Sequence, residues 1–380
     1  MTSRDPLPPL GLYLHIPFCA SRCQYCDFVT WAGKDHLIPA YLKALAREIE
    51  GFRGVMAKTI FFGGGTPSLL KAEEIGGLLK AIEGSFRVLP GAEISVEANP
   101  ADGGPDYFKA LVGRGVNRLS LGAQSFDDGE LRLLGRRHRA GDIARTFDRA
   151  REAGLENISL DLIYGLPGQA LEAFRRSLES ALGLGPEHLS LYALSLEEAT
   201  PLEKTVSRGE LPDPDPDEQA DMYLLAERLL GEAGYRHYEL SNWARPGREC
   251  RHNIIYWENG PYLGLGAGAH SCLRGVRSAR VASIEDYIHK VEAGESPVAE
   301  SEELGPELQR AETMFLGLRL VDGIDNAAFA RRFGGPPRSF FGPQIEELVG
   351  LGLLEERAGR LRLTPRGRLL ANQVFCRFLG

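Results

Sequence analysis

The chain has 380 residues, which is long enough for a full hydrophobic core and for more than one domain. A hydrophobic content of 43% with 25% charged residues is ordinary for a soluble globular protein, and a net charge of -8 argues against a dedicated nucleic-acid-binding protein. Residues 1–10 lack the basic start and apolar run of a signal peptide, and no apolar stretch is long enough to span a bilayer. Together with cysteines that form no disulfide-like framework, these features predict a cytoplasmic protein.

The first part of the chain alternates short β-rich runs with amphipathic segments. The predicted strands are Leu12–Phe18, Lys58–Gly64, Glu93–Ala98, Arg118–Gln124, Asn157–Tyr164 and His188–Leu194. The predicted helices between them include Pro39–Phe52, Ala72–Phe86, Asp142–Ala153 and Leu171–Leu184. This alternation predicts βαβ units that form a parallel sheet, and six such units are too few for the eight of a closed barrel.

Three cysteines follow the first predicted strand with the spacing C-x3-C-x2-C: Cys19, Cys23 and Cys26. A structural zinc site usually has four ligands, and this loop offers three. An iron–sulfur cluster held by three cysteines leaves one iron free to bind an outside molecule. Three unrelated buried thiols would not explain such a density among only six cysteines. The spacing therefore predicts a four-iron cluster with one open coordination position.

Polar motifs also follow or end the other predicted strands. They are Gly63–Pro67, Glu97–Pro100, Gln124–Phe126 and Asp161 with Tyr164–Pro167. The carboxyl ends of parallel strands are where α/β proteins build their binding sites, so these motifs predict one shared site. The glycine run would let the backbone approach a ligand closely, although an ordinary tight turn also uses glycine.

The rest of the chain has a different character. Residues 211–218, which read Leu-Pro-Asp-Pro-Asp-Pro-Asp-Glu, predict a stiff acidic linker before a helix over Gln219–Glu232. We divide the chain into a barrel domain over 1–235, a connecting region over 236–304 and a C-terminal domain over 305–380. The last is predicted to contain helices Glu307–Leu318, Asn326–Phe333 and Pro343–Val349 and a hairpin over Leu353–Leu363. These pieces resemble a mostly helical, winged-helix-like module. Its basic excess is small, so we favour a packing or lid role over DNA binding.

The cysteine loop resembles the signature of the radical S-adenosylmethionine (SAM) superfamily. This resemblance implies an open, partial (β/α)6 barrel whose cluster binds SAM through its amino and carboxylate groups and cleaves it to a 5′-deoxyadenosyl radical. The ordered motifs are more specifically similar to the oxygen-independent coproporphyrinogen III oxidase family, which includes the HemW branch of heme chaperones. The similarity covers Tyr13–Cys19, Gly63–Pro67, Ser95–Pro100, Gly122–Phe126 and Asp161–Pro167.

The resemblance implies two bound SAM molecules. Three residues match the group that contacts the SAM on the cluster: Tyr13, Gly64 and Glu97. Five match the set around a second SAM: Gly65, Thr66, Gln124, Arg136 and Asp161. These residue types suit the ligand, because a carboxylate can accept both ribose hydroxyls and an arginine can clamp a carboxylate. Arg137 lies beside Arg136, and either side chain could point inward.

Three features separate the two branches of the family. The resemblance implies that oxidases of the family carry the spacing C-x3-C-x2-C-x-C, whereas here Phe28 stands where the fourth cysteine would be. This chain also lacks the longer N-terminal extension of the oxidases. Residues 252–257 form the motif H-N-x-x-Y-W, which resembles the signature associated with heme binding in the HemW branch. A neutral imidazole is a good axial ligand for heme iron, which makes His252 the first candidate, and Tyr256 and Trp257 could flank the macrocycle. Unranked candidates for a second ligand are Cys250, His270 and Cys272.

The resemblance therefore implies a heme chaperone that binds heme and delivers it to acceptor hemoproteins such as respiratory enzymes. Its expected cofactors are a [4Fe-4S] cluster, one or two SAM molecules and heme. Its expected partners include an electron donor such as flavodoxin or ferredoxin and no nucleic acid, and a homodimer is an open alternative to a monomer. The enzyme alternative is oxidative decarboxylation of coproporphyrinogen III, and a third is a heme-responsive DNA-binding regulator.

Overall fold

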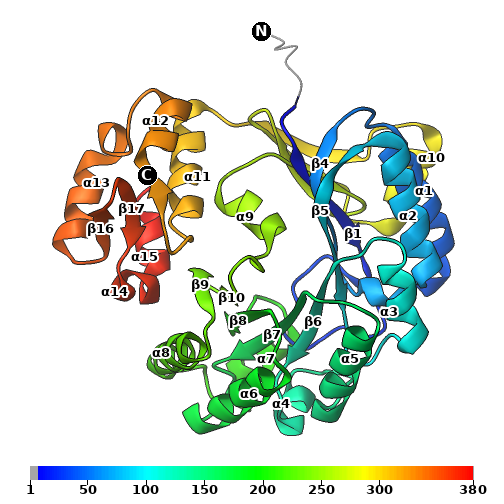
Figure 1. Ribbon diagram of the computed structural model, residues 1–380, viewed down its shortest axis with the longest axis horizontal. Coiled ribbons are helices and arrows are strands. Elements are labelled where there is room, and N and C mark those ends of the chain that lie inside the picture. The colour runs from blue at the N-terminus through cyan, green and yellow to red at the C-terminus, as the bar shows by residue number, and fades with distance from the viewer. Residues whose placement is uncertain (1–6, 380) are drawn as a thin grey trace.

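The chain forms an open barrel followed by a smaller C-terminal domain (Figure 1). The structure is a computed structural model that describes residues 7–379; residues 1–6, which begin the N-terminal segment considered above, and residue 380 lie outside the described part. Six parallel strands are neighbours in chain order: β1 (Leu10–Ile16), β4 (Met56–Gly64), β5 (Arg87–Ala98), β6 (Arg118–Gln124), β7 (Ile158–Tyr164) and β8 (His188–Ala193). This arrangement confirms the predicted α/β partial barrel.

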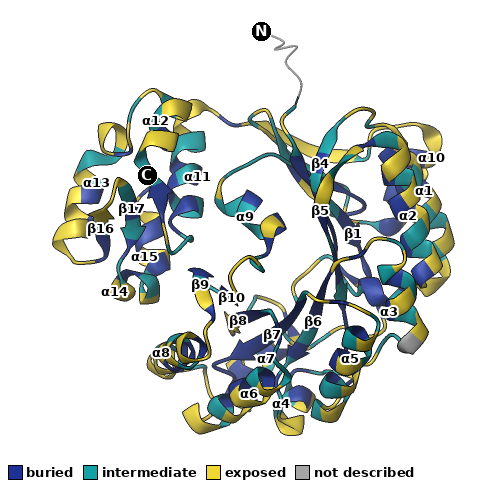
Figure 2. Cartoon of the chain, in the orientation of Figure 1, coloured by how far each residue is buried: buried dark blue, intermediate teal, exposed yellow. Residues whose placement is uncertain are grey.

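Helices cover the outer face of this sheet, and their exposed sides face away from it (Figure 2). Those predicted from the sequence are α1 (Ile38–Glu50), α2 (Ala72–Ser85), α5 (Ala140–Glu152) and α6 (Leu171–Leu184). Three short helices were not predicted: α3 (Pro105–Val112), α4 (Asp128–Leu133) and α7 (Pro201–Ser207). Each has too few turns to display a clear apolar periodicity. The main core lies between the strands and these helices.

The acidic linker is shorter than predicted because its last residues start a helix. Helix α8 (Pro216–Glu232) begins three residues before the predicted Gln219. The Asp215 carboxylate accepts hydrogen bonds from the backbone N–H groups of Asp217 and Glu218, and Pro216 occupies the first helical turn. A capping aspartate followed by proline favours a helix start, which outweighs the stiffness of the preceding Pro-Asp repeat.

The region 236–304 continues the barrel sheet at both of its edges, giving one sheet of 12 strands. At one edge β10 (Asn242–Ala244) pairs with β8, and β9 (Arg236–Glu239) pairs with β10. At the other, β11 (Tyr262–Leu265) pairs in parallel with β1, followed by the antiparallel strands β12 (His270–Leu273), β13 (Val276–Arg280) and β14 (Val298–Glu303). Helix α10 (Ile284–Ala293) packs beside α1. Helix α9 (Arg251–Trp257), which carries the H-N-x-x-Y-W motif, lies between the barrel and the C-terminal domain (Figure 1).

The C-terminal domain has a hydrophobic core of its own, built around residues such as Met314, Phe329 and Leu361. Its elements are α11 (Pro306–Gly317), β15 (Ile324–Asp325), α12 (Asn326–Phe333), α13 (Arg338–Gly350), β16 (Leu354–Arg357), β17 (Arg360–Leu363), α14 (Pro365–Leu369) and α15 (Ala371–Cys376). The predicted hairpin is present, and Ala358 (φ 50°) and Gly359 (φ 76°) adopt the positive φ values of a tight hairpin turn.

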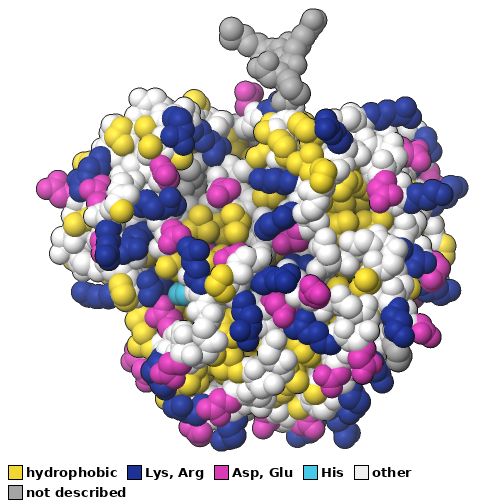
Figure 3. Space-filling model, in the orientation of Figure 1, with side chains coloured by type: hydrophobic (Ala, Val, Ile, Leu, Met, Phe, Trp, Pro, Cys, Tyr) yellow, Lys and Arg dark blue, Asp and Glu magenta, His cyan; other side chains and the backbone are white. Residues whose placement is uncertain are grey.

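Backbone hydrogen bonds attach this domain to the edge of the barrel sheet. The Leu240 N–H donates to the Arg319 carbonyl at 3.0 Å, and the Val321 N–H donates to the Tyr238 carbonyl at 3.0 Å. On the face shown in Figure 3, Lys and Arg side chains are interspersed with Asp and Glu rather than gathered in one basic area. Within residues 7–379, every helix is too short or too polar to cross a membrane.

Candidate functional site

A pocket of about 500 Å³ opens at the carboxyl ends of the barrel strands. We call it the cluster pocket. It brings together ten of the residues singled out from the sequence: Cys19, Cys23, Cys26, Gly64, Gly65, Thr66, Glu97, Gln124, Arg136 and Asp161. They lie on or follow β1, β4, β5, β6 and β7, and they gather on the side of the sheet where these parallel strands end.

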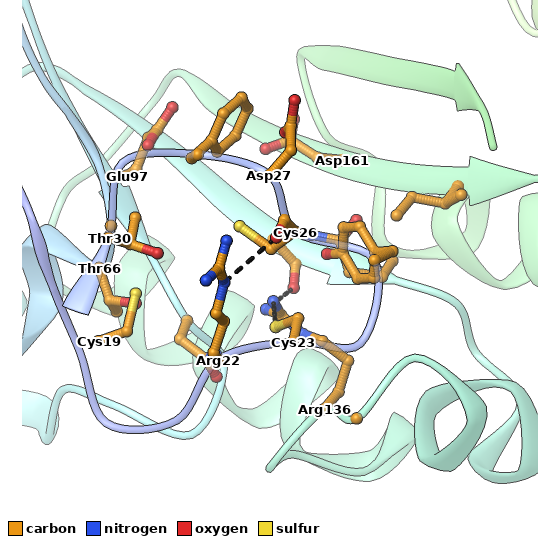
Figure 4. A pocket seen from close by; sticks show the side chains of 18 of the residues that line it. Cys19, Arg22, Cys23, Cys26, Asp27, Thr30, Thr66, Glu97, Arg136 and Asp161 are labelled. Carbon is orange, nitrogen blue, oxygen red and sulfur yellow. Dashed lines mark hydrogen bonds between the residues drawn. The ribbon is translucent and has the colours of Figure 1, made fainter. Parts of the chain in front are cut away.

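The three cysteine thiols of the loop are free and line the same pocket (Figure 4). Two of the sulfur atoms accept a hydrogen bond: Thr66 Oγ1 lies 3.5 Å from Cys19 Sγ, and Arg136 Nη1 lies 3.3 Å from Cys23 Sγ. Burial outweighs such donors in the protein without ligands and raises the pKa of the Cys19 and Cys26 thiols. In the described part of the chain, no three His, Cys, Asp or Glu side chains converge as a single metal ion requires. Three thiols spread around one cavity fit a larger group, such as an iron–sulfur cluster bound at three corners.

The strands β2 (Phe18–Cys19) and β3 (Trp31–Ala32) pair with each other and close the base of the cysteine loop. The glycine run packs directly against the end of β1 and against β2. The Gly65 N–H donates to the Ile16 carbonyl at 2.8 Å, and a Cβ on Gly65 would lie 2.6 Å from the Phe18 oxygen. Gly64 has φ +107°, and its Cβ would lie 2.4 Å from the His15 ring. These glycines are therefore required by packing as well as by access to the pocket.

Two acidic side chains face the pocket, Glu97 from the end of β5 and Asp161 from the middle of β7. The Glu97 carboxylate accepts the Gly64 N–H at 3.2 Å, and burial, reinforced by the charge of Asp161, raises the pKa of Glu97 to about 8. Asp161 accepts hydrogen bonds from Ser120 at 2.9 Å and Ser159 at 3.0 Å, and burial raises its pKa above the usual value. Both groups can accept hydrogen bonds from paired hydroxyls, as a ribose would offer.

The ambiguity between the two adjacent arginines is resolved by their contacts. Arg136 donates to Cys23 Sγ and to the Gly122 carbonyl at 2.9 Å, so its guanidinium lies beside the cysteine loop. Arg137 instead forms an ion pair with Asp102 at 2.8 Å at the rim of the pocket. Gln124 adopts a φ of 67°, a region that residues other than glycine rarely occupy, where β6 ends at the pocket.

Tyr13 does not line the cluster pocket. Its hydroxyl bonds His15 Nδ1 at 3.0 Å, and its ring stacks on Phe61 at 6.2 Å between ring centroids. It lines two smaller neighbouring cavities instead, both of which also contact Glu97. Tyr13 therefore stands beside Glu97 but does not line the pocket that contains the three thiols.

His252 is buried inside the barrel, with 1% of its surface exposed. Both ring nitrogens are hydrogen-bonded, Nδ1 to Thr59 Oγ1 at 2.7 Å and Nε2 to the Tyr256 hydroxyl at 2.8 Å. Burial lowers the pKa of His252 to about 3, so the ring is neutral. An iron bound to this ring would have to displace one of the two hydroxyl groups. In this arrangement the imidazole links α9 to β4 through its hydrogen bond with Thr59.

The aromatic rings of Tyr256 and Trp257, which follow His252 on α9, also pack against other side chains of the protein. The Tyr256 ring packs edge-on against Tyr262, with 4.7 Å between ring centroids. The Trp257 ring is covered by the Arg319 guanidinium of the C-terminal domain, 4.2 Å from the ring centroid. Trp257 therefore joins α9 to the C-terminal domain, whereas Tyr256 lies on the barrel side.

Several pocket residues were not predicted from the sequence to line the site. Tyr192 lies near the end of β8, Ser195 follows that strand, and Asp27 and Phe28 follow the third cysteine of the loop. Phe28 is 64% exposed and Tyr192 is 43% exposed, which is unusual for large aromatic side chains. The strand-end rule could have identified Tyr192, since it lies near the end of the parallel strand β8.

Comparisons with known proteins agree with this geometry. Residues 13–181 match the Radical SAM superfamily, and residues 304–370 match the HemN C-terminal domain. The chain is 39% identical over 376 residues to the heme chaperone HemW of Bacillus subtilis, a match covering 97% of this chain and 98% of that protein. It is 35% identical over 382 residues to the heme chaperone HemW of Escherichia coli, covering 98% of this chain and 99% of that protein.

A solved structure is similar along nearly the whole chain. It is the coproporphyrinogen III oxidase HemN from Escherichia coli, described as a radical SAM enzyme. The TM-score is 0.86 with 26% sequence identity, and the match covers 99% of this chain and 91% of that chain. The barrel and the C-terminal domain therefore both have counterparts in that protein.

Proposed function

Because the chain belongs to the HemW family within the radical SAM superfamily, we propose that it is a heme chaperone that binds heme and transfers it to acceptor hemoproteins. The observation that carries the proposal is the full-length similarity to heme chaperones. It is supported by Phe28, which stands at the position where the resemblance implies a fourth cysteine in the related oxidases. Acceptor hemoproteins such as respiratory enzymes are the partners that this function requires.

The cluster pocket supports binding of a [4Fe-4S] cluster and SAM. Cys19, Cys23 and Cys26 would hold the cluster, which when bound supplies an electron and an open iron to which SAM can bind. Gly64 and Glu97 would then hold the first SAM, with Tyr13 beside Glu97. A second SAM would contact the remaining predicted residues: Gly65, Thr66, Gln124, Arg136 and Asp161.

The protein's own residues would contribute position and charge to this site. Arg136 places a fixed positive charge beside the Cys23 sulfur, which favours the thiolate and a bound carboxylate alike. The Gly64 N–H orients the Glu97 carboxylate toward the pocket, and Ser120 and Ser159 orient Asp161. We place the function in the cytoplasm, where a flavodoxin or ferredoxin would supply electrons to the cluster.

The test is an anaerobic heme titration of the iron-loaded protein, followed by incubation with an apo-hemoprotein such as apomyoglobin. Saturable binding near one heme per chain and heme transfer to the acceptor are the expected results. A parallel assay supplies coproporphyrinogen III, SAM and a chemical reductant. Decarboxylated porphyrin products without heme binding would overturn the chaperone proposal in favour of the oxidase. Specific, salt-dependent binding to duplex DNA would favour a regulator instead.

A further inference from the structure

A pocket of about 620 Å³ lies where the barrel strands begin, at the opposite end of the sheet from the cluster pocket. We call it the interdomain pocket, because it is lined by Pro8, Pro9 and Lys58 of the barrel and by Gln309 and Arg332 of the C-terminal domain. It shares no lining residue with the cluster pocket or with the two cavities beside it. Its volume is typical of small-molecule sites, so a ligand here would be separate from any group in the cluster pocket.

The lining of the interdomain pocket has an excess of positive charge. It contains three cations, Lys58, Arg274 and Arg332, and one acid, Glu258, whose side chain is exposed. The chain as a whole has a net charge of -8, so this local excess runs against the overall charge. A cleft lined by charges of one sign focuses the electrostatic potential and attracts ions of the opposite sign. The interdomain pocket is therefore suited to an anion.

Two of these cations have no carboxylate partner in the protein. In the described part of the chain, Lys58 makes no side-chain hydrogen bond or ion pair. Arg332 donates to the Asn259 carbonyl at 3.1 Å and pairs with no carboxylate among residues 7–379. The charge of the buried Glu312 also acts on Arg332, but that carboxylate is already paired with Arg277. Lys58 and Arg332 can therefore bind an external anion without breaking an internal ion pair.

Irregular backbone positions two of the three cations. The pairing of β4 with both β1 and β5 shifts between Ala57 and Thr59, so Lys58 stands at a β-bulge. Bulges change the direction of a side chain and are common beside binding sites. Arg274 and Gly275 form the two-residue turn between β12 and β13, with φ values of 53° and 76°. Such a turn favours asparagine or glycine at its first position, so an arginine there carries a conformational cost. Both departures from regular structure meet at this pocket, which is typical of a functional site.

We propose that the interdomain pocket binds a small polyanion, a molecule with two or more phosphate or carboxylate groups, between Lys58 of the barrel and Arg332 of the C-terminal domain. Arg274 contributes a third positive charge to the same pocket. Pro8, Pro9 and Leu304 provide apolar contacts for the carbon skeleton of the ligand. This site is additional to the heme-chaperone function and does not depend on it.

The position of the site gives the ligand a structural effect. Lys58 lies on β4, whereas Arg332 lies on α12 of the C-terminal domain, which is attached to the opposite edge of the barrel sheet through β9 and the residues that follow it (Figure 1). A bound polyanion that contacts both cations would add a second connection between the two domains. Because binding stabilises the state that contains the complete site, the ligand should hold the C-terminal domain more firmly against the barrel.

The test is an anaerobic calorimetric titration of the iron-loaded protein at constant ionic strength. The two probes are 2,3-bisphosphoglycerate, which carries two phosphate groups, and tricarballylate, which carries carboxylates only. Lys58→Gln and Arg332→Gln should each weaken binding at least about tenfold, because each removes a charged hydrogen-bond donor. Their matched controls are Lys43→Gln and Arg331→Gln, which alter exposed cations outside the pocket and should bind like the wild type. Lys58→Arg keeps the charge and should retain binding.

Saturable binding of either probe with a Kd below about 1 mM, weakened in the pocket variants and not in the controls, would support the site. The tighter probe then identifies phosphate or carboxylate as the group recognised. A saturating probe should also slow proteolysis near residue 304 in the wild type and not in Arg332→Gln. No saturable binding of either probe, or equal affinities in pocket and control variants, would overturn the proposal. Unchanged urea unfolding of the ligand-free variants would exclude misfolding as the cause of a loss, and their iron content and heme binding should match the wild type.

Discussion

The Gly64 backbone N–H donates to the Glu97 carboxylate at 3.2 Å, which links the carboxyl ends of β4 and β5 beneath the cluster pocket. This bond favours the ionised carboxylate, but burial and the nearby charge of Asp161 outweigh it and raise the pKa of Glu97 to about 8. At neutral pH this acid is therefore largely protonated in the protein without ligands, and it can donate as well as accept a hydrogen bond.

The raised pKa of Glu97 predicts a pH-dependent stability for the cluster-free protein. The folded state holds a proton that the unfolded state releases near the ordinary glutamate pKa of 4.5, so the free energy of unfolding should fall as pH rises from about 5 to about 8. One such group contributes a slope of at most about 1.4 kcal/mol per pH unit. Urea unfolding at several pH values should show a smaller slope in Glu97→Gln, the remainder coming from Asp161. The exposed Glu179→Gln should keep the full slope; equal slopes in all three proteins would contradict the assignment.

Replacement of Cys23 by serine should abolish cluster assembly. Three thiolates hold the proposed cluster, and the loss of one leaves two irons without protein ligands. After anaerobic reconstitution, Cys23→Ser should contain little iron and sulfide and lack the brown cluster absorbance. Cys376→Ser provides a matched control, because Cys376 is a free, exposed cysteine outside the pocket. Wild-type iron content in Cys23→Ser would argue against the three-cysteine cluster.

The two candidate heme ligands should differ sharply in their effect on stability. His252→Ala removes a buried ring and leaves the Thr59 and Tyr256 hydroxyls without their partner. We expect it to lower the free energy of unfolding by about 2–4 kcal/mol. His270→Ala removes an exposed ring without internal bonds, and a change within about 0.5 kcal/mol is expected. Urea unfolding of the heme-free proteins measures both, and equal losses would show that His270 also has a structural role.

Arg319 should stabilise the attachment of the C-terminal domain. Its guanidinium covers Trp257 and lies 3.5 Å from the fully buried Glu239 carboxylate. Arg319→Ala should cost about 1–3 kcal/mol, since it removes this cover and leaves a buried acid without a counterion. It should also speed proteolysis near residue 304, between the two domains. Arg236→Ala breaks an exposed ion pair with Asp322 and should cost under about 1 kcal/mol. A similar loss in both variants would contradict a specific role for Arg319.

Much of the barrel could be predicted from the sequence because its signals are local. The helix over Leu171–Leu184 and the strand over Arg118–Gln124 have the predicted bounds, since apolar periodicity and the following glycine or polar motif mark each end. The added strands β9 to β14 were not predicted. They contain few residues each, and their pairing partners lie far away in the chain, as for β11 and β1.

The sequence by itself determined the cysteine loop, the order of the strands and the gathering of Glu97, Gln124 and Asp161 at one edge of the sheet. Parallel strands connected by helices leave little freedom in where their ends lie. Only the tertiary structure decided that Arg136 faces the thiols, that His252 is buried and that His270 is free. The bond between Thr59 and His252 joins residues 193 positions apart, and no local pattern reports a contact across such a separation. The chemistry of a side chain is set by the groups that the fold brings to it, whereas its residue type only limits what that chemistry can be.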